Sequence, residues 1–141
     1  MSLQPTLIKD LRTWASGYCA DRAAVDLLIT HEEWLHRADF QRLMEPMVDG
    51  DGRPFTVIYW DRVSAVVNTG DLPASSSALS VLRIALSLAV GEPVDLGDAL
   101  TGLDATNTAA VAAAMVTAAQ ADDRVKVTLA ARQLPSWLRE R

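Results

Sequence analysis

The most apolar segment of the chain, residues 78–90, sets the strongest limit on what the chain can fold into. Only Ser80, Arg83 and Ser87 interrupt its apolar side chains. The segment is shorter than the roughly 18 to 20 residues that a helix needs to cross a bilayer. In water, a helix that is apolar on most sides must be covered by other elements. The segment therefore predicts a buried central helix with the rest of the chain packed against it.

Apolar side chains recur at helical spacing through most of the sequence, which is typical of amphipathic helices. The longest predicted helices are one at residues 5–16, the central one that follows residues 72–76 and is closed by Gly91, and a last one that Asp104 or Thr106 can cap and that continues to about Gln120. Shorter helices lie between them. The fold class that we expect is mainly α: a compact bundle of about six helices with a minor two-stranded β ribbon. A single domain of 141 residues buries enough surface to fold without metals or disulfides.

Two segments have the composition of strands. Residues 55–60 are rich in β-branched and aromatic side chains and follow the turn-like sequence Asp-Gly-Asp-Gly at 49–52. Residues 125–129 alternate between apolar and polar side chains, with the period of a strand. Because two isolated strands are marginally stable, we expect these two to pair as a ribbon against the helices.

A short helix is predicted after Asp39, whose carboxylate can accept hydrogen bonds from the free backbone N–H groups of a first turn. Apolar side chains then fall at i, i+3, i+4 and i+7, which is one helix face: Phe40, Leu43, Met44 and Met47. Pro46 is expected to end this helix or to bend its last turn.

The formal charge of the chain is −5, and it is unevenly distributed. Residues 1–121 contain fifteen acids and eight bases, whereas residues 122–141 contain three acids and five bases. Nucleic acid phosphates and anionic lipids repel an acidic protein, so we expect no membrane partner, and nucleic acid is disfavoured. Only the C-terminal tail is locally basic.

The single cysteine and the N-terminal residues indicate in which cellular compartment the protein is found. Cys19 is the only cysteine, so no disulfide can form within the chain. The first residues lack the basic stretch and the apolar core of a secretion signal. Both observations predict a cytoplasmic protein.

Three segments in the middle of the chain resemble one group of proteins. They are residues 72–77, 81–85 and 94–104, with the sequences LPASSS, VLRIA and VDLGDALTGLD. The group is a family of small uncharacterised proteins of GC-rich actinobacteria, and the many alanines and arginines beside only two lysines agree with that origin. The resemblance covers about the middle third of the chain. It implies a shared fold, and it transfers no catalytic residue because the group has no assigned activity.

The two histidines do not have the spacing of a shared metal site. His31 and His36 are five residues apart, which places them about 140° apart around a helix, whereas zinc-protease helices use a spacing of four. Glu33 and His36 match the Glu-x-x-His spacing of di-iron bundles, but a second pair is missing and only a dimer could supply it. We expect no metal and no cofactor.

The acidic turn at residues 49–52 resembles only the start of a calcium loop. The fifth, sixth and twelfth positions of such a loop are occupied here by Arg53, Pro54 and Trp60, which cannot supply the required ligands and glycine. A plain turn is therefore favoured. Cys19 is interpreted as a small apolar side chain rather than a nucleophile. Since the common enzyme motifs are absent from the sequence, we assign no catalytic residue and favour a protein that is not an enzyme.

A narrow polar stripe follows one side of the predicted central helix, at positions i, i+4, i+7 and i+11: Ser76, Ser80, Arg83 and Ser87. Three interpretations are open. The stripe faces solvent, Arg83 forms a structural ion pair, or the stripe lines a pocket that binds an anion. The candidate partners of an ion pair are Asp61, Asp95, Asp98 and Asp104.

Small side chains surround nearly the whole helix predicted at residues 108–119. Such a helix can pack closely in the core, or it can present a flat face for self-association. We favour core packing, because large exposed apolar patches are uncommon on monomers.

Three functions follow from these observations. The first is a non-enzymatic interaction or regulatory module, whose partner is a second copy of the chain or a different protein. The second is a protein that binds a small ligand or an anion through Arg83, with Ser76, Ser80 and Ser87 beside it. The third, disfavoured by the acidic charge, is a DNA-binding regulator that uses helices near Arg37 and Arg42.

Overall fold

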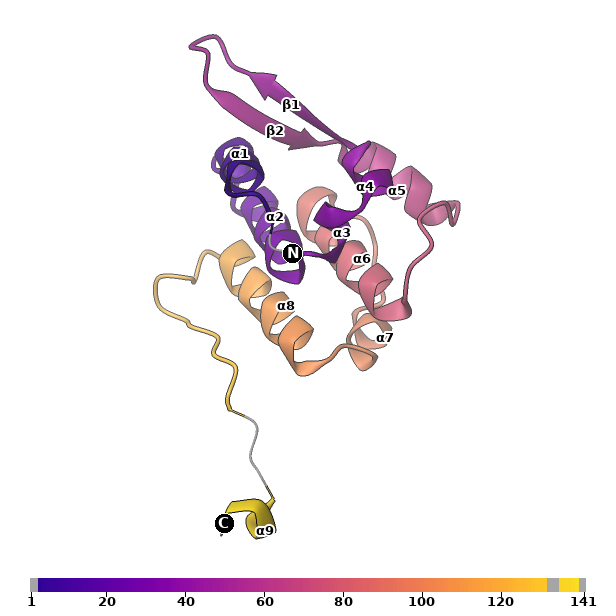
Figure 1. The fold of residues 1–141 in the computed structure, drawn as a ribbon, viewed down its shortest axis with the longest axis vertical. Helices are drawn as coiled ribbons and strands as arrows, with labels where there is room; N and C mark the ends of the chain where they lie inside the picture. The colour runs from indigo at the N-terminus through magenta and orange to yellow at the C-terminus, as the bar shows by residue number, and fades with distance from the viewer. Residues whose placement is uncertain (1–2, 132–134, 140–141) are drawn as a thin grey trace.

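Helices dominate the computed structural model, which describes residues 3–131 and 135–139 (Figure 1). The prediction of a mainly helical fold with a minor two-stranded ribbon is confirmed. None of the helices in the described part of the chain has the length and apolar character that crossing a bilayer requires. In chain order, the elements are α1 (Pro5–Ala15), α2 (Cys19–His31), α3 (Glu33–His36), α4 (Ala38–Gln41), β1 (Met44–Val48), β2 (Pro54–Ile58), α5 (Trp60–Asn68), α6 (Ser76–Val90), α7 (Leu96–Thr101), α8 (Ala105–Ala118) and α9 (Ser136–Arg139).

The core forms where α2 packs against α6, α8 and α1 (Figure 1). Leu28 of α2, Leu82 of α6 and Val111 of α8 are fully shielded from solvent there. The predicted central helix is confirmed, because α6 buries side chains over most of its circumference. Its buried residues are Ala78, Val81, Leu82, Ile84, Ala85 and Leu86.

Side-chain caps fix where the helices of the second half begin. The hydroxyl of Ser75 accepts a hydrogen bond from the backbone N–H of Ala78 at the start of α6. At the start of α8, the carboxylate of Asp104 accepts one from the N–H of Asn107 at 2.7 Å. Each cap satisfies a backbone donor that a helix leaves free in its first turn. Of the two caps that the sequence allowed for the last long helix, Asp104 and Thr106, the structure uses Asp104.

A glycine in the left-handed region ends α6, and this gives a first prediction. Gly91 has φ +72, and an added Cβ would have nothing within 4 Å. We expect Gly91→Ala to lower the free energy of unfolding by about 1 kcal/mol, because a Cβ is strained at positive φ even where space is free. Urea unfolding measures this change. Gly102→Ala is the matched control, since Gly102 also has open space but a φ of −97. Equal stability of the two variants would contradict the argument.

The short helix predicted after Asp39 is mostly wrong. Helix α4 ends at Gln41, and strand β1 begins at Met44, so only the first part of the predicted segment is helical. Strand β1 pairs antiparallel with β2, and Pro46 lies opposite Thr56. A proline lacks the N–H that a continuing helix would need, whereas a strand at the edge of a sheet tolerates it.

The predicted ribbon is confirmed, but one of its two strands was wrongly assigned. Strand β2 pairs with its sequence neighbour β1 and not with residues 125–129, which form neither helix nor strand. The acidic turn makes the local pairing favourable. The carboxylate of Asp49 accepts hydrogen bonds from the N–H groups of Asp51 and Arg53, and Gly52 adopts φ +78. Closing this short loop costs less entropy than joining segments about seventy residues apart.

Both edges of the hairpin carry a proline at a position that faces outward. The N–H of Asp49 donates to Arg53 and that of Tyr59 donates to Leu43, so the odd-numbered residues of β1 direct their backbone groups toward β2. Pro46 therefore directs its backbone away from the hairpin, and Pro54 does the same on the opposite edge. Because a proline has no N–H to offer, neither edge is well suited to adding a further strand.

Candidate functional site

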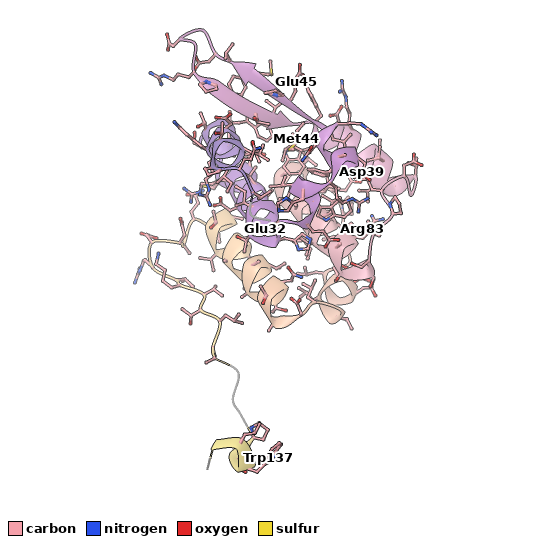
Figure 2. All side chains as sticks on the ribbon, viewed as in Figure 1. Glu32, Asp39, Met44, Glu45, Arg83 and Trp137 are labelled. Carbon is pink, nitrogen blue, oxygen red and sulfur yellow. The ribbon has the colours of Figure 1, made fainter. Side chains whose placement is uncertain are left out.

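Three residues of the predicted polar stripe lie together between α6 and α7. Ser76, Ser80 and Arg83 line a shallow hollow of about 310 Å³, and Asp95 and Asp98 lie on its opposite side. Arg83 is exposed on α6, as Figure 2 shows by its label. The hollow is therefore an open surface feature and not a buried pocket.

The charges around Arg83 oppose an anion. Two carboxylates, from Asp95 and Asp98, share the hollow with one guanidinium, so the local charge repels a negative ligand. Within the part of the chain that the structure describes, no carboxylate lies within ion-pair distance of Arg83. Ser87 is half-buried and does not line the hollow. This arrangement agrees best with the solvent-facing interpretation of the stripe.

A second prediction concerns Arg83 directly. We expect Arg83→Ala to change the free energy of unfolding by less than about 0.5 kcal/mol, because the side chain is exposed and holds no ion pair among the described residues. We also expect inorganic phosphate to leave the Tm of both proteins unchanged in thermal-shift measurements. A phosphate-dependent rise in Tm that is lost in Arg83→Ala would instead support the anion site.

The two histidines lie beside different glutamates. His31 is nearly buried at the end of α2, with Nδ1 2.9 Å from Asn107 Oδ1 and Nε2 3.5 Å from Glu33 Oε2. His36 Nε2 lies 4.0 Å from Glu32 Oε2. His31 thus connects the end of α2 to the first turn of α8. No group of three metal-binding side chains occurs in the region that the structure describes.

A larger groove, which we call the N-terminal groove, lies between residues 3–7, helices α3 and α4, and the hairpin. Its volume is about 530 Å³, within the range of ligand-binding clefts. Figure 2 labels Met44 on its hairpin side. The apolar residues that line the groove are Leu3, Leu7, Leu35, Met44 and Pro46, and the polar ones are Gln4, His36, Gln41 and Thr56.

Neutral groups that both donate and accept hydrogen bonds line the N-terminal groove. Thr56 is only 5% exposed, and its hydroxyl has no hydrogen-bond partner among the described residues, although it borders the groove. Gln41 donates from Nε2 to the carbonyl of Leu35 at 3.0 Å, and its amide oxygen has no hydrogen-bond partner in the described part of the chain. Amide and hydroxyl groups of this kind are complementary to a peptide backbone. The groove is thus apolar with a few neutral polar groups.

Arg37, one of the two arginines of the DNA-binding hypothesis, already pairs with a carboxylate. Arg37 donates from Nε to Asp39 at 3.0 Å and from Nη2 at 2.6 Å, and its guanidinium lies 4.6 Å from the centre of the Trp34 ring. This bidentate pair raises the pKa of Arg37 and lowers that of Asp39. A phosphate would have to displace a carboxylate held by two hydrogen bonds, which further disfavours the DNA hypothesis.

The same pair gives a third prediction, on pH. The hydrogen bonds from Arg37 lower the pKa of Asp39 from its ordinary value of 3.8. A carboxylate whose pKa is lowered by folding stabilises the fold above its ordinary pKa and loses that contribution as the pH falls through the lowered pKa. Near neutral pH we expect Asp39→Asn to reduce stability by about 0.5 kcal/mol, since the side chain is partly exposed.

Urea unfolding at several pH values tests this prediction. The difference between the wild type and Asp39→Asn is expected to shrink as the pH falls below 3.8. Asp123→Asn is the control, because Asp123 is exposed and holds no ion pair or side-chain hydrogen bond within the described ranges. A difference that stays constant with pH would show that the pair is not the cause.

The C-terminal arm, which we define as residues 123–131 and 135–139, leads away from the helical body (Figure 1). All residues from Asp123 to Ala131 are exposed. Its start is fixed by an ion pair of 2.8 Å between Arg22 and Asp122. Large apolar side chains project from the arm into solvent, with exposed fractions of 37% to 64%: Val125, Val127, Leu129, Trp137 and Leu138.

Among protein-family models, curated proteins and solved structures, none matches this chain. The resemblance to actinobacterial proteins therefore stays a prediction. What the chain does has to be argued from the grooves, the arm and their charges.

Sequence reasoning missed the N-terminal groove. Its lining comes from the N-terminal segment, α3, α4 and both strands, so no local motif contains it. Because Met44 and Met47 were predicted to lie on a helix, a groove wall formed by strand β1 was not expected. The composition of the arm was easier to recognise, because its alternating apolar residues and its excess of bases are visible in the sequence. What the sequence did not indicate is that these side chains are exposed, with Val125 and Val127 bordering only a shallow hollow beside α8.

Proposed function

We infer that this chain is a non-enzymatic interaction module that binds a partner protein through its C-terminal arm. The observation that carries this proposal is the exposure of five large apolar side chains on the arm. Exposed apolar side chains at such density are typical of binding segments, because leaving them in water is unfavourable and burying them on a partner recovers that free energy. A tryptophan is moreover the residue type most enriched among strong interface contacts.

Arm-directed cross-linking tests this function. A photoreactive phenylalanine derivative is placed at Leu129, which is 56% exposed, in cells that express the chain. We expect covalent adducts with a defined protein, identified by mass spectrometry, that disappear when Trp137 and Leu138 are replaced by serine. The control carries the same group at Thr101, an exposed residue of α7. Equal adducts at both positions, or none at either, would refute the proposal.

A further inference from the structure

We propose that the partner of the C-terminal arm is a second copy of the chain, and that the arm enters that copy's N-terminal groove with Trp137 as its anchor. This proposal rests on the proposed function, since it names the partner of the same arm. The structure supplies both halves of the contact. One half is an exposed apolar segment, and the other is an apolar groove bordered by unpaired neutral polar groups.

The chemistry of the groove fits an apolar peptide. Leu7, Leu35 and Met44 provide an apolar surface for a ring such as that of Trp137. Among the described residues, neither the hydroxyl of Thr56, a buried residue, nor the amide oxygen of Gln41 has a hydrogen-bond partner. Thr56 and Gln41 both border the groove, where a ligand can form hydrogen bonds with them. A peptide backbone presents the N–H and C=O groups that these side chains can pair with.

Charge favours an arm from another copy of the same chain. Residues 1–121 contain fifteen acids and eight bases, and residues 122–141 contain three acids and five bases. Two acidic bodies repel one another, whereas a basic arm is attracted to an acidic body. Glu32 lies beside the groove and not in its lining, with its carboxylate 4.0 Å from His36, which does line the groove.

The geometry favours exchange between copies over folding back onto the same copy. Figure 2 shows Trp137 far from Met44: Met44 lies where the hairpin meets the helical body, and Trp137 lies at the end of the arm. The first residues after α8 are held in place, because Arg22 pairs with Asp122 and the N–H of Val125 donates to the carbonyl of Ala121 at 2.8 Å. Each copy has one arm and one groove, so two copies that exchange arms form a closed dimer with twofold symmetry. Neither contact then leaves an open end for further assembly.

Sedimentation of the full chain over a wide concentration range tests the exchange. We expect a reversible dimer that Trp137→Ala weakens tenfold or more, since anchoring tryptophans dominate such contacts. We expect the same from Gln4→Arg, which places a bulky cation at the groove. Thr6→Arg is the matched control, because Thr6 is equally exposed but does not line the groove. All three positions are exposed, so thermal unfolding should confirm that each variant remains folded.

Mixing two defective chains gives a sharper result. Trp137→Ala retains an intact groove, and Gln4→Arg retains an intact arm, so an equal mixture restores one of the two contacts. We expect heterodimers in the mixture that are more stable than either homodimer. A mixture that associates no better than its components would overturn the proposal.

Cross-linking distinguishes the remaining outcomes. A photoreactive phenylalanine derivative at position 137 is activated in a mixture of unlabelled and ¹⁵N-labelled chains. Cross-links to Leu3 or Met44 that join labelled to unlabelled chains support exchange. Cross-links only within one chain show that the arm folds back, which overturns the second-copy proposal. If purified chains do not cross-link but arm-dependent adducts with another protein form in cells, this proposal fails and the proposed function stands. If neither forms, both fail.

Discussion

Replacing Trp34 with alanine is expected to lower the free energy of unfolding by about 3 to 5 kcal/mol, the largest effect of any substitution considered. Trp34 is completely buried, and its indole N–H donates to the backbone carbonyl of Ala78 at 2.8 Å. Its ring also packs on Phe40, with 5.9 Å between ring centres. The variant loses this packing, leaves a cavity, and loses the hydrogen bond between the indole N–H and the Ala78 carbonyl. Urea unfolding at neutral pH gives the magnitude.

Two further variants separate the causes. Trp34→Phe keeps an aromatic ring but removes the N–H, so we expect an intermediate loss that reports mainly on the hydrogen bond to Ala78. Trp137→Ala makes the same chemical change at a residue that is 64% exposed, and we expect almost no loss in a monomer. If Trp34→Ala and Trp137→Ala cost the same, then Trp34 does not hold α3 to α6.

The central helix α6, which Trp34 contacts, was predictable from the sequence alone. Helix α6 buries side chains over most of its circumference, so its apolar run and its ending glycine are local features that do not depend on the rest of the fold. The cap of α8 was predictable to within two residues, Asp104 or Thr106, for the same reason, because a cap acts on its own first turn. Local signals of this kind predict the same helix whichever other elements pack against it.

The hairpin shows where such patterns fail. The spacing of Phe40, Leu43, Met44 and Met47 fits one helix face, yet the strand begins at Met44. Phe40 is fully buried, whereas Met47 is 43% exposed, so the four residues do not share one environment. The deciding factors are Pro46 and the acidic turn, which make a local hairpin less costly than a longer helix. Tertiary context here overrides the apolar period.

The candidate sites were predictable to different degrees. Arg83 and two of its serines do lie together, because they share one helix face. The N-terminal groove was not predictable, since its walls meet only after the hairpin and α3 have packed beside residues 3–7. A single sequence contains no signal for contacts between such distant segments. The apolar and basic composition of the arm was visible in the sequence, but it predicted a paired strand at residues 125–129 and not an exposed segment.

Helix α8 had two interpretations, and the structure favours close packing. Ala110 and Ala114 are buried, and α8 packs against α2 and α6. Alanines at such a crossing let two helix backbones approach closely, because no side chain holds them apart. Ala113, one residue away on the same helix, is exposed. The two neighbours therefore give a direct test of which side of α8 faces the core.

Ala114→Leu is accordingly expected to lower the free energy of unfolding by about 1 to 3 kcal/mol, the usual cost of forcing extra volume into a packed core. Ala113→Leu is the matched control, since it adds the same atoms to the same helix with almost no change in helix propensity, and we expect a change below about 0.5 kcal/mol. Urea unfolding compares the two. If α8 were instead a self-association face, Ala113→Leu would alter sedimentation and Ala114→Leu would leave stability unchanged. Helix α8 leads into the segment where Asp122 pairs with Arg22, directly before the arm, so loosening this helix should weaken association together with stability.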